Sequence, residues 1–160
     1  MQLKGSCHCG AVTFEVTSKH AYPFMRCYCS ICRKTMGGGG YAINLGADAN
    51  SMTVSGREHL SVYRAMIDRG QGPQQSSGER NFCRHCGSGL WLFDPTWPDL
   101  IHPFASAIDT ELPATPESVH IMLNYKPAWV EPALQAGDPS FGEYPDESLA
   151  KWHERHGLET

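Results

Sequence analysis

The chain has 160 residues, which is enough for one domain with an apolar core that needs no disulfides. Its formal net charge of −4 excludes the basic surface of a protein that binds nucleic acid or an anionic membrane. No apolar run approaches the roughly 18–20 residues of a membrane span, and the first residues lack the apolar region of a signal peptide. We therefore expect no nucleic-acid or membrane partner, and a cytoplasmic location.

Sixteen glycines and eleven prolines indicate many turns and short strands rather than a helical bundle. The first predicted strand covers 10–16, where Val12, Phe14 and Val16 share one face at period two. A short helical turn is expected within or just after 29–34. Further strands are predicted at 41–45, 52–55, 60–64, 90–93, 100–105 and 119–123.

Two segments of a different kind complete the expected order of elements. The polar stretch 68–80, with three glycines, is the best candidate for a mobile loop. Near the carboxyl end, Asp146 can cap a helix, Leu149 and Trp152 form a short apolar stripe, and Gly157 suits the position after the last turn. The sequence therefore predicts a mainly β domain with one short C-terminal helix.

The seven cysteines fall into three short clusters, and none lies elsewhere. Their odd number and the expected reducing compartment disfavour structural disulfides. Cysteines used only as small apolar core residues would be scattered along the chain. The clustering therefore indicates metal ligation. The clusters are Cys7-His8-Cys9, Cys27-Tyr28-Cys29-Ser30-Ile31-Cys32 and Cys83-Arg84-His85-Cys86.

Two of these clusters are each followed by glycine, a pattern typical of zinc-knuckle turns. Cys83 and Cys86 precede Gly87, and Cys7 and Cys9 precede Gly10. A glycine there can adopt positive φ while backbone N–H groups face the thiolates. The four thiolates together would form a closed structural zinc site. A redox function is disfavoured, because neither C-x-x-C lies in the βαβ context of thioredoxin-like proteins.

The remaining cluster has three cysteines, Cys27, Cys29 and Cys32, and spacing alone does not fix its partners. Cys29 and Cys32 could equally share a metal ion with Cys83 and Cys86, which would leave three other cysteines. If the grouping is four plus three, the second site keeps a vacant position, which in zinc proteins is the mark of a catalytic site. Such a site would bind a small thiol and deprotonate it at neutral pH.

Alternatives for the second site are a structural zinc or an iron–sulfur cluster. Iron–sulfur motifs need four ligands per cluster at spacings that this chain does not show. A structural zinc would need a histidine as its fourth ligand. The candidates are His8, His20 and His85. In contrast, His102 and His120 lie in predicted strands and are interpreted as structural.

Three stretches, in this order, resemble the glutathione-dependent formaldehyde-activating enzyme family: G-S-C-H-C-G-A-V-T-F, C-Y-C-S-I-C-R-K-T and F-C-R-H-C-G-S-G-L-W. The resemblance covers roughly residues 2–130, and all seven cysteines are in register with the family's ligands. It implies a β-tent fold of small antiparallel sheets held by zinc-binding turns.

The resemblance also implies a division of roles among the cysteines. Cys7, Cys9, Cys83 and Cys86 would hold a structural zinc. Cys27, Cys29 and Cys32 would hold a catalytic zinc, where the thiol of glutathione binds before it condenses with formaldehyde. Two zinc ions per chain are expected, the second held less firmly because three ligands grip less tightly than four.

The function predicted from these observations is that of a zinc-dependent carbon–sulfur lyase acting on a small thiol adduct. Its candidate reaction is S-(hydroxymethyl)glutathione formation. The alternative is a non-catalytic zinc-binding module for a protein or small-molecule partner. We expect a zinc-binding domain over 1–130 and an extension over 131–160 whose helix packs on it. Arg26, Arg33 and Lys34 flank the three-cysteine cluster and are interpreted as a solvated basic turn.

Overall fold

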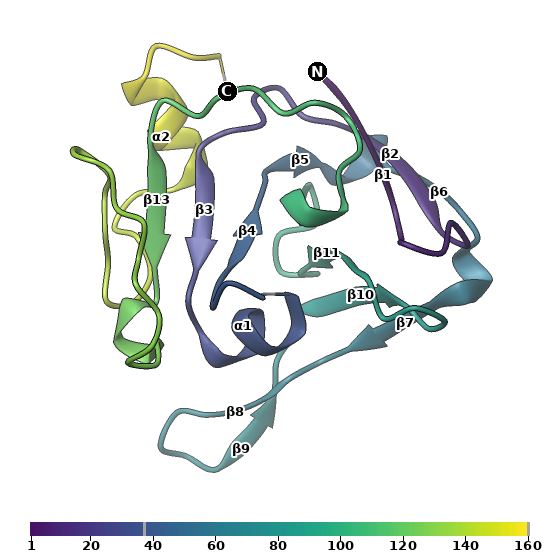
Figure 1. The fold of residues 1–160 in the computed structure, drawn as a ribbon, viewed down its shortest axis with the longest axis horizontal. Helices are drawn as coiled ribbons and strands as arrows, with labels where there is room; N and C mark the ends of the chain where they lie inside the picture. The colour runs from purple at the N-terminus through teal and green to yellow at the C-terminus, as the bar shows by residue number, and fades with distance from the viewer. Residues whose placement is uncertain (37, 160) are drawn as a thin grey trace.

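The structure, a computed structural model, describes residues 1–36 and 38–159 and is built from small sheets (Figure 1). The first sheet is antiparallel with the order β1 (Gln2–Ser6), β2 (Thr13–Thr17), β6 (Thr53–Ser55). The second is antiparallel with the order β5 (Ala47–Asp48), β12 (Leu100–Pro103), β11 (Gly89–Phe93), β10 (Glu79–Cys83), β7 (Leu60–Tyr63). The third has the order β13 (Ser118–Ile121), β3 (Phe24–Cys27), β4 (Ala42–Asn44), and β8 (Met66–Asp68) pairs with β9 (Pro73–Gln75) as a hairpin. The chain is thus mainly β, as predicted, although β13 pairs with β3 in parallel.

The helices are short. The α-helices are α1 (Ser30–Met36) and α2 (Leu149–Arg155). The 3₁₀ helices are η1 (Ala49–Ser51), η2 (Arg57–His59), η3 (Ala105–Ala107) and η4 (Leu123–Tyr125). Within the described ranges, no helix is long and apolar enough to cross a bilayer.

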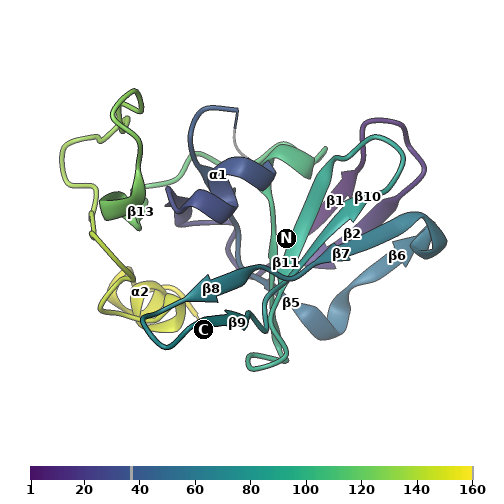
Figure 2. The ribbon, with the colours of Figure 1, turned by 90° about the horizontal axis from the view of Figure 1, so that it is seen from below.

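The main core lies between the first and second sheets, which sit together at one end of the molecule (Figure 2). Val12, Phe14 and Val16 are buried there, as the period-two pattern predicts. The ring of Phe14 packs edge-on against Trp91 of β11, with centroids 5.2 Å apart. Cys7 and Cys83 belong to the same core, so the two knuckles start from its edge.

A second core holds the other cysteines. Cys27 and Cys32 are buried there with Phe104, Val119 and Trp152. Helix α1 comes close to the second sheet because Gly89 of β11 has no side chain. A Cβ atom at Gly89 would lie 1.7 Å from the sulfur of Met36, the last residue of α1.

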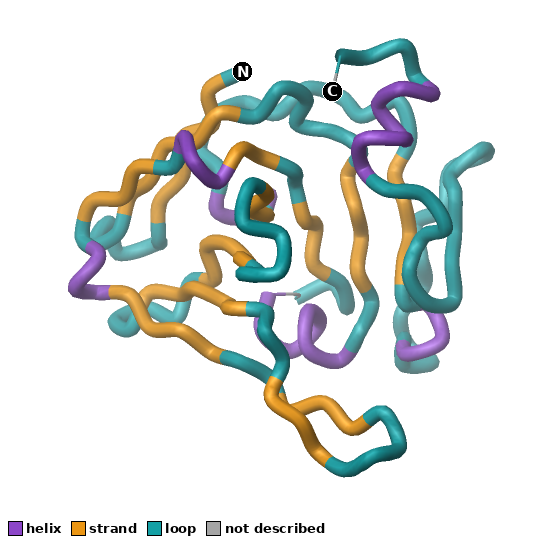
Figure 3. Tube along the Cα trace, turned by 180° about the vertical axis from the view of Figure 1, so that it is seen from behind, coloured by secondary structure: helices purple, strands orange, loops and turns teal. Residues whose placement is uncertain are grey.

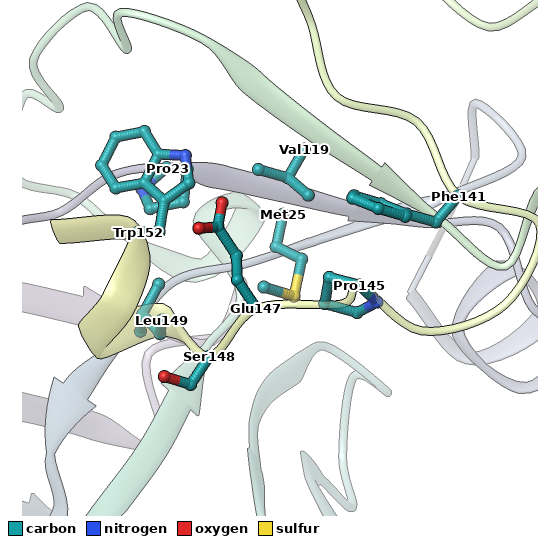
Figure 4. A pocket seen from close by; sticks show the side chains of 9 residues that line it. All are labelled: Pro23, Met25, Val119, Phe141, Pro145, Glu147, Ser148, Leu149 and Trp152. Atoms are coloured by element: carbon teal, nitrogen blue, oxygen red, sulfur yellow. The ribbon is translucent and has the colours of Figure 1, made fainter. Parts of the chain in front are cut away.

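Helix α2 covers this second core at the ends of β3 and β13. Figure 4 shows Trp152 and Leu149 beside Pro23, Met25 and Val119 in a shallow pocket at this junction. The predicted stripe is therefore the docking face of the helix. Its predicted cap is wrong by two residues.

The N-cap of α2 is Ser148, whose hydroxyl accepts from the Lys151 N–H at 3.2 Å. Asp146 lies two residues too early, and Glu147 is instead bonded to Arg155 at 2.7 Å. At the other end Gly157 has a φ of +68°, as expected of a residue that follows a helix.

Seven predicted strands are confirmed as β2, β4, β6, β7, β11, β12 and β13, and the helical turn near 29–34 is α1. Strand β2 starts at Thr13 rather than residue 10, because Gly10 and Val12 bond back to Cys7 in a turn. Likewise the predicted strand 100–105 ends at Pro103, and η3 follows.

The prediction of a loop over 68–80 is wrong. The segment contains most of the β8–β9 hairpin, which projects from the body, and the first residues of β10 (Figure 1). The carboxylate of Asp68 accepts from the N–H groups of Gly70 and Gly72 at 2.8 and 3.1 Å, which closes the hairpin tip.

Most of the segment between η4 and α2 is irregular and forms long loops (Figure 3). It is bound to the third sheet: His120 N–H donates to Pro139 O at 2.9 Å, and Phe141 N–H donates to His120 O at 2.8 Å. The division of the chain at residue 130 stays a prediction.

Candidate functional site

The first cysteine group joins the tips of two hairpins. Cys7 and Cys9 lie in the β1–β2 turn, and Cys83 and Cys86 lie at the β10–β11 turn. All four Sγ atoms lie within 4.8 Å of one another. The Sγ atoms of Cys7 and Cys9 are 3.6 Å apart, and those of Cys9 and Cys83 are 3.7 Å apart. A tetrahedron with Zn–S bonds of about 2.3 Å has edges of about 3.8 Å, so the sulfurs fit a zinc ion.

Glycine makes both knuckle turns possible. Gly10 has a φ of +76° and donates its N–H to Cys7 O at 3.0 Å. Gly87 has a φ of +73° and donates to Cys83 O at 2.8 Å. In the first turn, the Val12 N–H also points to the sulfur of Cys7 at 3.2 Å, which stabilises a thiolate there.

Ser88 connects the two knuckles. Its hydroxyl accepts from the His8 N–H at 3.0 Å and lies 3.2 Å from the sulfur of Cys86. These contacts with Ser88 lower the pKa of the Cys86 thiol to about 5. The turn thus favours a thiolate, the form in which cysteine binds metals.

The second group is formed within one loop. Cys27 ends β3, Cys32 lies in α1, and Cys29 lies between these elements. Their Sγ atoms also lie within 4.8 Å of one another. The Cys32 N–H donates to the sulfur of Cys29 at 3.3 Å, so the first turn of α1 is hydrogen-bonded to that sulfur. Cys27 and Cys32 are buried, whereas Cys29 is half-buried and forms the outer side of the group.

These three thiols compete for protons. Hydrogen bonds from Cys27 and Cys32 lower the pKa of Cys29 to about 2. Hydrogen bonding to Cys29, with burial, raises the pKa of Cys27. Three thiolates so close together repel one another, and a cation among them removes that repulsion. The donor set of soft sulfurs suits zinc.

Two arginines near the second cysteine group each have a buried Nε atom without a hydrogen-bond partner. Arg80 of β10 is only 7% exposed, and its Nε has no hydrogen-bond partner. Hydrogen bonding within the group and burial together raise the pKa of the Cys32 thiol to about 11, and the charge of Arg80 partly opposes this rise. The Nε of Arg33, in α1, is also buried without a partner. A buried guanidinium needs a negative charge nearby, and three thiolates around a divalent cation carry a net charge of −1.

Against this geometry, the glutathione-dependent formaldehyde-activating enzyme family matches the chain over residues 2–124. The chain belongs to this family. All seven cysteines lie inside the matched residues, whereas α2 lies outside them.

One relative carries the name of this family, and one solved structure has a similar fold. A protein of Halomonas elongata, provisionally named as a glutathione-dependent formaldehyde-activating enzyme, is 62% identical over 159 residues, covering 99% of both chains. A crystal structure of a Rhodobacter sphaeroides protein has a TM-score of 0.53 at 24% identity. The match covers 86% of this chain and 98% of the Rhodobacter chain, and it shows that the two chains share a fold.

In this family member, none of the suggested histidines joins the second group within the described residues. His20 bonds to Glu159 O at 2.9 Å, and His85 bonds to His59 at 2.9 Å. His102 and His120 are structural, as predicted, because His102 bonds to Leu45 O and His120 is bonded through both ring nitrogens.

The basic residues around the second group do not form one solvated turn. Lys34 is exposed, but Arg26 is half-buried, donates to the hydroxyl of Tyr41 at 2.8 Å and lies over its ring. Sequence reasoning missed Arg80 altogether, since it lies at the end of the segment predicted as a loop. No local pattern marks it, because Arg80 and its neighbour Asn81 in β10 are both buried and the strand shows no alternation.

Proposed function

We propose that this protein binds two zinc ions and catalyses the formation of S-(hydroxymethyl)glutathione from glutathione and formaldehyde. One observation carries the proposal: the second cysteine group has three sulfurs rather than four, and one of them, that of Cys29, is half-buried. A metal held there keeps a position for a ligand from outside the protein. In zinc enzymes such a position is where chemistry takes place.

The first group has a structural function in this account. Its four sulfurs complete a tetrahedral site, so no position remains for a substrate. It joins two hairpins that are far apart in sequence, and its binding free energy therefore contributes to folding.

Zinc at the second group would hold the glutathione thiol as a thiolate by lowering its pKa. The chain's own residues would hold the metal ion that takes up this thiolate, with Cys27, Cys29 and Cys32 as its ligands. Cys27 and Cys32 are buried, so the half-buried Cys29 is the ligand that a thiol from outside would approach. The positive charge of Arg80 partly balances the added negative charge.

The reaction itself joins two molecules. A bond forms between the glutathione sulfur and the formaldehyde carbon, the carbonyl π bond breaks, and the oxygen takes up the proton that the thiol released. Because the thiolate is held in place, most of the gain comes from activation and proximity. None of the seven cysteines forms a disulfide, as expected in the reducing cytoplasm, where we place the protein.

The test is exchange spectroscopy by NMR of glutathione mixed with formaldehyde, with and without the zinc-loaded protein. We expect the protein to accelerate exchange between the free and hydroxymethylated thiol above the spontaneous rate. The Cys29→Ser variant should lose this acceleration. The Ser30→Ala variant, which changes the exposed neighbour, should keep it.

Exchange that is no faster with the wild-type protein than without it would overturn the proposed reaction. If such a protein nevertheless held two zinc ions, the result would favour a non-catalytic zinc-binding module.

A further inference from the structure

A chain of three buried polar side chains starts at the residue between Cys27 and Cys29. The hydroxyl of Tyr28 lies 2.8 Å from Nδ1 of His120, and Nε2 of His120 lies 3.3 Å from Oδ2 of Asp138. Tyr28 and His120 are 0% exposed, and the side chain of Asp138 is 4% exposed. Buried polar groups persist when they are hydrogen-bonded, as these are.

The hydrogen bonds in this chain run in one direction. The Asp138 carboxylate accepts from the Ser118 and Gln135 N–H groups, each at 2.9 Å, which stabilises its ionised form. A carboxylate only accepts, so Nε2 of His120 donates to it. Nδ1 of the neutral ring then accepts from the hydroxyl of Tyr28.

Tyr28 is fixed by its backbone as well. Its N–H donates to Ile121 O at 3.1 Å, which continues the pairing of β3 with β13. Its ring is stacked on that of His120, with centroids 5.7 Å apart and planes at 16°. The peptide units on either side of Tyr28 carry the two sulfurs of the C-x-C turn, so fixing Tyr28 fixes both.

Asp138 lies outside residues 2–124, which match the family. Yet it is held by its own loop, through Gln135, and by β13, through Ser118. The chain of hydrogen bonds therefore connects the segment after η4 to the second cysteine group through a single histidine.

We propose that Tyr28, His120 and Asp138 are positioning residues that hold Cys27 and Cys29 ready to bind the second metal ion. The inference rests on the proposed role of the second group as a metal site. Partners that orient metal ligands without touching the metal contribute strongly to affinity. In this protein they act on the backbone that carries the ligands, from a segment that the family match does not include.

The test uses the full-length Tyr28→Phe and Asp138→Asn variants, which remove a hydroxyl or a charge with little change in volume. Co²⁺ replaces Zn²⁺ as the probe, because its absorption reports thiolate ligands and their geometry. Competition with a chelator gives the affinity of each site. We expect both variants to bind Co²⁺ at the second site on the order of tenfold more weakly. The first site should keep its wild-type affinity.

The Tyr41→Phe variant is the matched control. Its ring centroid lies 5.3 Å from that of Tyr28, and its hydroxyl accepts from Arg26, so it is near the chain but not part of it. It should bind both Co²⁺ ions as the wild type does.

Unchanged second-site affinity in Tyr28→Phe would overturn the inference, even if Asp138→Asn fails to fold. Equal weakening of both sites would also overturn it, because that result indicates only a general loss of stability. These outcomes differ from failure of the proposed metal role of the second group, in which the wild-type protein itself would bind Co²⁺ only at the first site. They differ also from failure of the proposed reaction, which is read from thiol exchange and not from Co²⁺ affinity.

Discussion

Arg80 is a buried positive charge whose natural counter-charge is the second cysteine group. Its half-buried neighbour Glu79 is already paired with Arg64, and within the described residues no carboxylate forms an ion pair with Arg80. A buried charge without a partner strongly destabilises a fold. Three thiolates with one divalent cation supply the missing negative charge. Arg80 and the metal site therefore stabilise each other.

Replacing Arg80 by methionine should raise the pH at which the second site fills with metal. Without the positive charge the thiols ionise less readily, and the midpoint should move upward by about one pH unit or more. Arg80→Lys should keep part of the effect. The measurement is a pH titration of Co²⁺ thiolate absorption at the second site.

Arg64→Met serves as the control, because Arg64 is an exposed residue whose ion pair with Glu79 lies on the surface. An equal midpoint in wild type and Arg80→Met would show that the guanidinium does not act on the thiols.

At the scale of elements, the first knuckle depends on a close approach by the β6–η2 turn. Gly56 has a φ of +80°, and a Cβ atom there would lie 1.9 Å from the carbonyl oxygen of Ala11. Ala11 follows the Cys7–Gly10 turn directly. The turn is thus held from behind by backbone that only glycine allows.

The Gly56→Ala variant should be destabilised by more than its backbone conformation alone explains. Positive φ costs alanine about 1–2 kcal/mol, and displacement of the Ala11 carbonyl adds about 1–3 kcal/mol. Gly70→Ala separates the two effects, since Gly70 has a φ of +90° with open space around it. Urea unfolding of both variants measures the difference, and equal destabilisation would remove the steric argument.

A strict alternation predicted β2, whereas β11 and β13 were predicted as short strands without one. Val12, Phe14 and Val16 identified β2, because one face of that strand meets the core. Strand β3 was missed because its residues 24–26 are all half-buried, so no alternation exists to detect. The β8–β9 hairpin was missed since glycine and glutamine resemble a loop, while Asp68 closes it through backbone contacts that composition does not reveal.

The candidate site shows the same limit. The cysteine clusters were visible as short motifs, and the structure separates their sulfurs into groups of four and three. Spacing alone had left that grouping open. Arg80 and Asp138 could not be found, because each reaches the second group or its loop across the fold from a distant part of the sequence.

At the scale of the whole molecule, the described residues form two cores, each with one cysteine group at its edge. The first group joins the sheets that enclose the main core, and the second lies in the smaller core under α2. Loss of metal should therefore have unequal consequences. The first group links residues 74 positions apart, whereas the second lies within one loop.

Stability should fall as the pH drops below about 6.5, the ordinary pKa of histidine. Burial removes both rings from water and thereby lowers the pKa of His120 and that of His102. Below this pH the histidines of the unfolded chain bind protons that the same histidines in the folded chain do not bind, so acid favours unfolding. Urea midpoints at pH 7.5 and 5.5 with excess zinc measure the drop. It should be smaller in His102→Gln than in the wild type, and a full wild-type drop there would contradict this origin.

The zinc content of the wild type, Cys29→Ser and Cys86→Ser tests the division of roles among the cysteines most directly. We expect about two zinc ions per wild-type chain, from the two groups of sulfurs. Cys29→Ser should hold about one and stay folded by circular dichroism, because the loss is confined to one loop. Cys86→Ser should unfold or precipitate, since the closed site contributes to folding. A single zinc in the wild type, or collapse of Cys29→Ser as complete as that of Cys86→Ser, would contradict the account.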